Sequence, residues 1–182
     1  MFASRYFVSF LAFTGLAVMA SPTPVEKRAD VSDVLEIVDT LKTSTSSILP
    51  QLNALVSAEK ATEETVAPLI SNLVAALNTA SSSLASLGSV EATVGGTATD
   101  VANAVAPIIS DIVTTVNSVN TAVPGVVGLL GSLGLDLALN QVLTGLETLL
   151  SGVLNLVAQL LTDVAGLLRS LSLGLTLASL GL

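Results

Sequence analysis

Cysteine, histidine and tryptophan are missing from this chain of 182 residues, and its few aromatic and methionine residues all lie within the first 20 positions. Without cysteine, no disulfide framework can hold the fold together, so stability must come from packing. Without cysteine or histidine, a metal site would need oxygen ligands only, and no acidic loop has the spacing of a calcium site. Without stacking aromatics or a basic stripe, the chain lacks what nucleic-acid binding requires.

The first 28 residues have the features of a segment that directs secretion and is then removed. A basic residue, a short apolar run and a small-residue end predict a signal peptide over residues 1–20, cleaved after Ala20. The apolar run is too short for a transmembrane helix. Residues 21–28 contain two prolines and end in Lys27-Arg28, which predicts a pro-segment cut after Arg28. The alternative is a linker in which the dibasic pair has no role.

Charge divides the predicted mature chain, residues 29–182, into two unlike halves. It keeps three basic and thirteen acidic residues, a net charge of −10, which argues against attraction to anionic lipid. Ten of the acids lie in residues 29–117, whereas residues 118–182 hold three acids and one arginine. The longest charge-free runs are interrupted by proline and asparagine, so we expect no membrane span.

Apolar residues in the acidic region, 29–123, recur at spacings of three and four, which predicts amphipathic helices. Asp30 and Asp33 suit the start of a first helix, and Thr62 the start of a second. We expect three helices in this region, with glycines separating the second from the third.

An internal repeat lies within these predicted helices. Residues 66–78 and 105–117 are identical at seven of thirteen positions, and residues 48–56 form a weaker third copy. Each copy contains a proline, which we expect to start or kink a helix. True repetition predicts stacked, similar hairpins and no particular chemistry. The alternative is that alanine-rich amphipathic helices resemble each other by chance.

Residues 124–134 hold four glycines and predict a flexible connection, after which residues 135–182 form a leucine-rich apolar region. This region carries an unbroken heptad pattern that predicts one long helix with a hydrophobic interaction seam. The seam consists of Leu139, Leu143, Leu146, Leu150, Val153, Val157, Leu160, Val164, Leu167 and Leu171. The fold prediction is therefore all-α, an amphipathic helix bundle of three shorter helices plus one long Leu-rich C-terminal helix. The seam could be the core of that bundle or a surface that meets a partner.

Candidate catalytic groups are scarce. The adjacent Glu63 and Glu64 are typical of a solvated helix start, and no Gly-x-Ser-x-Gly turn occurs. Arg169 could meet a ligand carboxylate, but a basic residue near a helix C-terminus more often interacts with the helix dipole. We expect no enzyme activity, no metal and no cofactor.

The arrangement resembles a family of secreted fungal proteins. The resemblance rests on the signal peptide, the Lys-Arg boundary, the Ala-Asp-Val start, and amphipathic helices with Leu-x-x-Leu and Val-Ala-Pro motifs. These features are similar to those of secreted fungal hydrophobic-surface-binding and cell-wall proteins. The polar half followed by an apolar half resembles still more the cysteine-free secreted proteins of mushroom-forming fungi linked to aerial hyphae and attachment. The resemblance implies an extracellular, wall-associated protein that coats or adheres to hydrophobic surfaces.

These observations favour a secreted, non-enzymatic surface-active or adhesion protein whose partners are hydrophobic surfaces, cell-wall components, lipid or further copies of itself. A carrier of a fatty acid or sterol, bound in an apolar groove between helices, is the alternative. A purely structural wall protein is a third reading.

Overall fold

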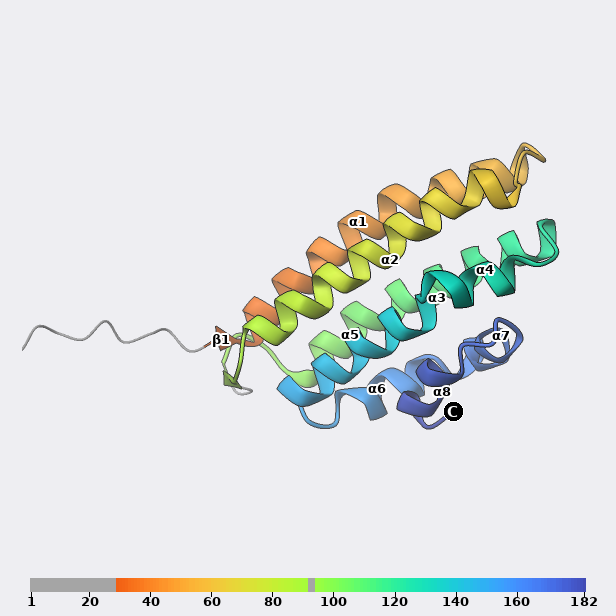
Figure 1. The fold of residues 1–182 in the computed structure, drawn as a ribbon. Coiled ribbons are helices and arrows are strands. Elements are labelled where there is room, and N and C mark those ends of the chain that lie inside the picture. The colour runs from red at the N-terminus through yellow and green to blue at the C-terminus, as the bar shows by residue number, and fades with distance from the viewer. Residues whose placement is uncertain (1–28, 92–93) are drawn as a thin grey trace, which may run out of the picture.

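The computed structural model describes residues 29–91 and 94–182 (Figure 1). The predicted signal peptide and pro-segment, with Ala20, Lys27 and Arg28, lie outside the described residues. The described part is almost entirely helical, so the predicted all-α class is confirmed.

Three long helices come first and shorter ones follow. The long helices are α1 (Val31–Ser57), α2 (Glu63–Ser86) and α3 (Ala98–Ala122). The shorter helices are α4 (Val126–Leu133), α5 (Leu135–Leu149), α6 (Val153–Leu160), α7 (Ala165–Ser170) and α8 (Gly174–Leu180), with a 3-10 turn, η1 (Thr162–Val164), between α6 and α7. Two residues of β1 (Ala29–Asp30) pair in parallel with β2 (Val90–Glu91).

Each long helix begins with a capping box, in which two residues three positions apart satisfy each other's backbone N–H groups. The pairs are Asp30 with Asp33, Thr62 with Thr65, and Thr97 with Asp100. The predicted helix start at Thr62 is therefore confirmed. Because these caps are local in sequence, they define the first turn of α1, α2 and α3 without help from distant residues.

The two best repeat copies lie at matching places in α2 and α3. Their equivalent apolar positions are buried in both helices: Val66, Ile70, Leu73 and Leu77, and Val105, Ile109, Ile112 and Val116. The prolines of the three copies, Pro50, Pro68 and Pro107, lie inside helices, so none of them starts one. All three are exposed, which places the carbonyl left without its usual N–H partner toward solvent.

The prediction of one long C-terminal helix preceded by a flexible connection is wrong. Most of residues 124–134 forms α4. The heptad region is broken after α5, again at η1, and between α7 and α8. Two of these breaks contain residues in the left-handed region, Gly152 with φ of 88° and Ser172 with φ of 58°. A helix cannot pass through such a residue, so the helices of residues 29–122 are the long ones.

The helices form a closed ring around a single core (Figure 1). Helix α1 packs against α2 and α3, and α2 packs against α5. The gap between α3 and α5 is closed by the C-terminal helices, because α6 and α7 contact α3 while α6 and α8 contact α5. In Figure 1 these C-terminal helices form the lowest layer, below α3 and α5. We call residues 153–182, which comprise α6, η1, α7 and α8, the lid.

No single helix among the described residues has the length and hydropathy needed to cross a membrane. Two pairs of successive helices reach that length and composition together, but α4 and α5 are bent by 49° and α6 and the segment Thr162–Ser170 by 61°.

Candidate functional site

The predicted interaction seam lies inside the ring. Seven of its ten residues are at most 1% exposed: Leu139, Leu143, Leu146, Leu150, Val153, Val157 and Leu171. Val164 and Leu167 are half-buried, and Leu160 is 51% exposed. Most of the seam therefore belongs to the hydrophobic core, where it packs the inner faces of α5 and α6 against the rest of the bundle.

The seam changes register at the end of α6. Leu160 points outward, whereas its neighbour Leu161 is 1% exposed, and one heptad later Leu168 is buried. Leu161 is four residues after the buried Val157 and Leu160 is three, and in an α-helix the i+4 position lies closer to the face of residue i than the i+3 position does. The buried face returns to the seam at Leu171.

Asp136, near the start of α5, binds the first turn of α8 through its carboxylate. Its two oxygens accept hydrogen bonds from the backbone N–H of Leu175 at 2.8 Å and of Thr176 at 2.9 Å. The hydroxyl of Thr176, which is fully buried, donates to the same carboxylate at 2.8 Å. A turn further along, the Ser179 hydroxyl donates to the Asn140 side-chain oxygen. We use the name clasp for five residues: Asp136, Asn140, Leu175, Thr176 and Ser179.

Glu147 caps α6 in a similar way from the last turn of α5. Its carboxylate accepts hydrogen bonds from the backbone N–H of Gly152 at 2.9 Å and of Leu154 at 3.0 Å. Helix α6 has no capping side chain of its own, because its N-cap residue is Gly152. Two of the three acids in the leucine-rich half thus act as helix caps from outside the helix they cap.

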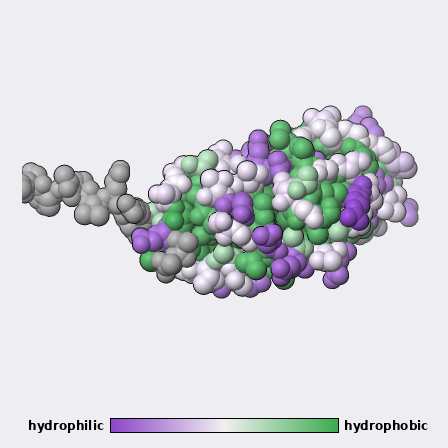
Figure 2. All heavy atoms as spheres, turned by 90° about the horizontal axis from the view of Figure 1, so that it is seen from below, coloured by the Kyte–Doolittle hydropathy of each residue, from purple (hydrophilic) through white to green (hydrophobic). Residues whose placement is uncertain are grey.

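Three of the four most exposed large hydrophobic side chains that the structure describes belong to the C-terminal half, and the fourth, Val94, precedes α3. Among the described residues, the large hydrophobic side chains that stand most exposed are Leu137, Leu160, Leu175 and Val94. Leu137 follows Asp136, and Leu175 donates a hydrogen bond to it, so both flank the clasp. Figure 2, which views the molecule from the lid side, shows hydrophobic residues reaching the surface in several patches between polar ones.

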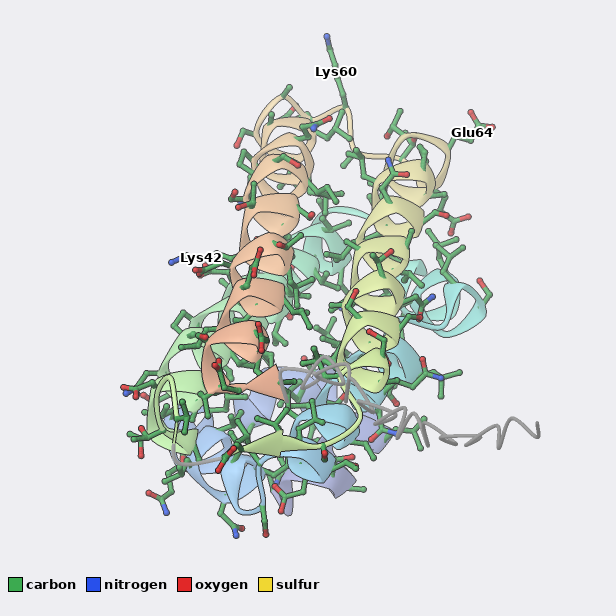
Figure 3. The ribbon with its side chains drawn as sticks, turned by 90° about the vertical axis from the view of Figure 1, so that its left-hand side faces the viewer. Lys42, Lys60 and Glu64 are labelled. Atoms are coloured by element: carbon green, nitrogen blue, oxygen red, sulfur yellow. The ribbon has the colours of Figure 1, made fainter. Side chains whose placement is uncertain are left out.

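Charge lies mostly away from the lid. Within residues 153–182 the charged side chains are Asp163 and Arg169, which balance. Lys42, Lys60 and Glu64, on α1, the following loop and α2, point away from the body of the bundle (Figure 3). The molecule therefore has most of its acids on the long helices, whereas the lid has no net side-chain charge.

The cavities are small or polar. A pocket of about 150 Å³ lies between α1 and α2, with Ile37, Leu41, Ala76 and Ala80 in its lining beside four hydroxyl residues. A larger groove of about 530 Å³ between α2 and α5 is lined mainly by serine, threonine, asparagine and glutamine. Among the residues that the structure describes, no three potential metal ligands of the histidine, cysteine or acidic type come together. Arg169 is exposed and lies in the last turn of α7, where its charge suits the helix dipole.

No family model matches the sequence. A search of curated proteins finds similarity to fruiting body differentiation protein 16 of the fungus Flammulina velutipes. The two are 42% identical over 89 residues, which cover 46% of this chain and 68% of the relative. The chain belongs to the family of fruiting body differentiation protein 16. The resemblance to proteins of mushroom-forming fungi is confirmed at this level, and the relative's name describes a stage of development, with no surface or ligand.

Sequence reasoning does not find the residues that hold the C-terminal helices in place. By sequence alone, Asp136 and Glu147 are only two of the three acids in residues 118–182. Their isolation was the available signal, because a lone acid in a leucine-rich stretch needs a hydrogen-bonding partner when it is partly buried. The identity of that partner, 39 positions away for Asp136, comes only from the fold.

Proposed function

We propose that this chain is a secreted, non-enzymatic surface-active or adhesion protein that binds hydrophobic surfaces or coats the fungal cell wall. The observation that carries the proposal is the amphiphilic surface. The long helices hold most of the acids, whereas the lid is uncharged overall and displays exposed leucines. Such a molecule lowers its free energy at a boundary between water and an apolar phase, because the apolar side leaves water while the acids stay hydrated.

The relative's role in fruiting supports the same reading. A fruiting body that emerges into air has boundaries between apolar material and water and between water and air. An amphiphilic coat lowers the free energy of both kinds of boundary. A neutral apolar phase fits better than an anionic membrane, since the predicted mature chain has a net charge of −10.

The alternative carrier function has less support. The pocket between α1 and α2, which has apolar side chains in its lining, is about 150 Å³. A cavity of this size holds a molecule about as large as benzene, far smaller than a sterol or a long fatty acid. The larger grooves are lined by polar side chains. A carrier would therefore have to open the bundle before it could bind such a ligand.

Adsorption of the purified mature chain tests the proposal. We expect retention on silanised, hydrophobic glass after washing, little retention on bare glass, and a fall in surface tension at the air–water boundary. Equal retention on both glasses, or none on either, would contradict the proposal. Sequencing the N-terminus of the same secreted material tests processing, and we expect the first residue to be Ala29.

A further inference from the structure

An apolar face of the molecule is hidden between the lid and the helices beside it. The inner side chains of the lid are nearly inaccessible to water: Val153, Val157, Leu161, Leu168, Leu171 and Leu180. They pack on α3 and on the α5 part of the seam. The exposed leucines of the closed form are few by comparison, so the closed surface offers an apolar phase only a fraction of what the molecule contains.

The clasp is the polar connection between α5 and the far end of the lid, whereas Glu147 of α5 caps α6 at the near end. In the described part of the chain, the side-chain hydrogen bonds that join residues 39 or 40 positions apart all belong to the clasp. They connect Asp136 and Asn140 of α5 to α8. The side-chain bonds within α1, α2 and α3 link residues five or fewer positions apart. Releasing the clasp therefore detaches α8 from α5, keeps the Glu147 cap on α6 at the near end of the lid, and leaves the hydrogen bonds of the long helices unchanged.

A hinge lies at the other end of the lid. Gly152 has φ of 88°, and no atom lies within 4 Å of the position a Cβ would take there. No side chain crowds this point, the Gly152 N–H is held, among the described residues, by Glu147 alone, and glycine tolerates both hands of rotation. Beyond the hinge, the lid is built from helices of six to eight residues that have no side-chain cap of their own. Such short helices depend on packing for their stability, so they can rearrange when a different apolar surface replaces the core.

The clasp is also where an apolar surface can first touch the molecule. Leu137, which follows Asp136 in sequence, is 50% exposed, and Leu175, whose backbone N–H donates to the Asp136 carboxylate, is 48% exposed. An apolar phase that covers these two leucines removes water from around the clasp. The acids of α1 and α2 stay on the opposite side of the ring, where they remain in water.

We propose that the adsorbing surface is the face now buried between the lid and α3 and α5, and that its partner is a neutral apolar phase. The inference rests on the proposed surface activity and gives it a mechanism. In water the lid is closed, because opening would expose the seam. At an apolar phase the side chains of the seam can contact that phase, which keeps them out of water. The phase therefore binds the open form and shifts the population toward it. The clasp sets how fast the lid opens.

A reversible lock on the lid tests this mechanism. The protein has no native cysteine, so the double variant Asn140→Cys and Ser179→Cys places one thiol pair on α5 and α8, where the two side chains already touch. Oxidation closes the lid covalently, and reduction releases it in the same molecule. Adsorption is followed as the fall of interfacial tension at a hexadecane–water drop, and circular dichroism confirms that both forms are helical. We expect the oxidised form to adsorb about tenfold more slowly than the reduced form, a ratio equivalent to about 1.4 kcal/mol in the barrier.

The outcomes separate the mechanism from the function. If the oxidised and reduced forms adsorb equally fast, adsorption uses the closed surface, and the opening lid is overturned while the surface activity stands. If neither form nor the unmodified chain adsorbs, the proposed function fails and the mechanism fails with it.

A second pair of variants keeps the test independent of the engineered disulfide. Asp136→Asn weakens the clasp, and we expect faster adsorption than in the parent at unchanged final coverage. Asp163→Asn, an exposed acid of the lid with the same change of charge, is the matched control and should leave the rate unchanged. Equal rates for the two variants would contradict a clasp that controls opening.

Discussion

In α1, α2 and α3 a pair of nearby side chains caps the first turn, whereas in α4 to α8 the N-cap residue makes no side-chain hydrogen bond. The first three helices also have 24 to 27 residues, while those of the C-terminal part have 6 to 15. Where caps occur in the C-terminal part, at α6 and α8, they come from α5. Local sequence thus specifies the long helices, and tertiary contacts specify the lid.

This difference explains how one chain can be both stable and adaptable. Each long helix has its own start signal, a proline tolerated on the exposed side, and an apolar stripe against the core. The lid is rich in leucine and glycine, and the caps of α6 and α8 come from side chains of α5. A segment that depends on its neighbours for both packing and capping is the part expected to open at low free-energy cost.

A charge in the seam should have the largest effect. Leu143 is fully buried in α5, so Leu143→Glu places an unpaired carboxylate in the core. We expect a loss of about 4 kcal/mol or more, which is enough to unfold much of the protein. Leu160→Glu, on the same heptad track but 51% exposed, should change stability by no more than about 0.5 kcal/mol. Urea unfolding followed by circular dichroism measures both, and similar losses would mean that α6 continues the α5 register in solution.

Loss of the clasp should come next. Asp136→Asn replaces one acceptor oxygen by an N–H₂ group that faces backbone donors, and it removes the charge from the remaining bonds. We expect about 2 kcal/mol of destabilisation, because hydrogen bonds to charged groups each contribute about 1.5–3 kcal/mol. Hydrogen exchange should show the loss concentrated in α8, with α1 to α3 unchanged. Uniform loss of protection through all helices would mean that the lid does not open separately from the ring.

A local cap should matter less and act elsewhere. Thr62→Ala removes the hydroxyl that accepts the Thr65 N–H at the start of α2. The expected cost is about 1 kcal/mol, typical of an N-cap threonine. Thermal unfolding gives the magnitude. Hydrogen exchange should place the change at the first turn of α2, and a change in α8 instead would contradict the division between local and tertiary capping.

The sequence predicts the long helices well and the lid poorly, for reasons visible in three glycines. Gly145, Gly152 and Gly166 occupy one heptad position, and by pattern alone they are equivalent. In the structure, Gly145 lies beside Leu84 with room for a Cβ at ordinary contact distance, Gly152 turns the chain with positive φ, and Gly166 lies in α7 with open space beside it. Apolar periodicity records which residues face a core, but it does not record whether the helix between them is continuous. The breaks between the helices bring Asp136 and Thr176 together, so the hydrogen bonds of the clasp could not be predicted from periodicity either.

Two glycine substitutions should have effects of opposite sign, and the one at Gly128 should give the smallest effect. Gly152→Ala puts a Cβ on a residue with φ of 88°, and because no neighbour lies within 4 Å, its cost of about 1–2 kcal/mol comes from the backbone alone. Gly128 lies inside α4 with open space around it and without positive φ, so Gly128→Ala should stabilise the protein by about 0.5–1 kcal/mol. Thermal unfolding of the two variants beside the parent measures both signs. If Gly152→Ala instead stabilises the protein, α5 and α6 join into one helix in solution, and the hinge of the lid is lost with it.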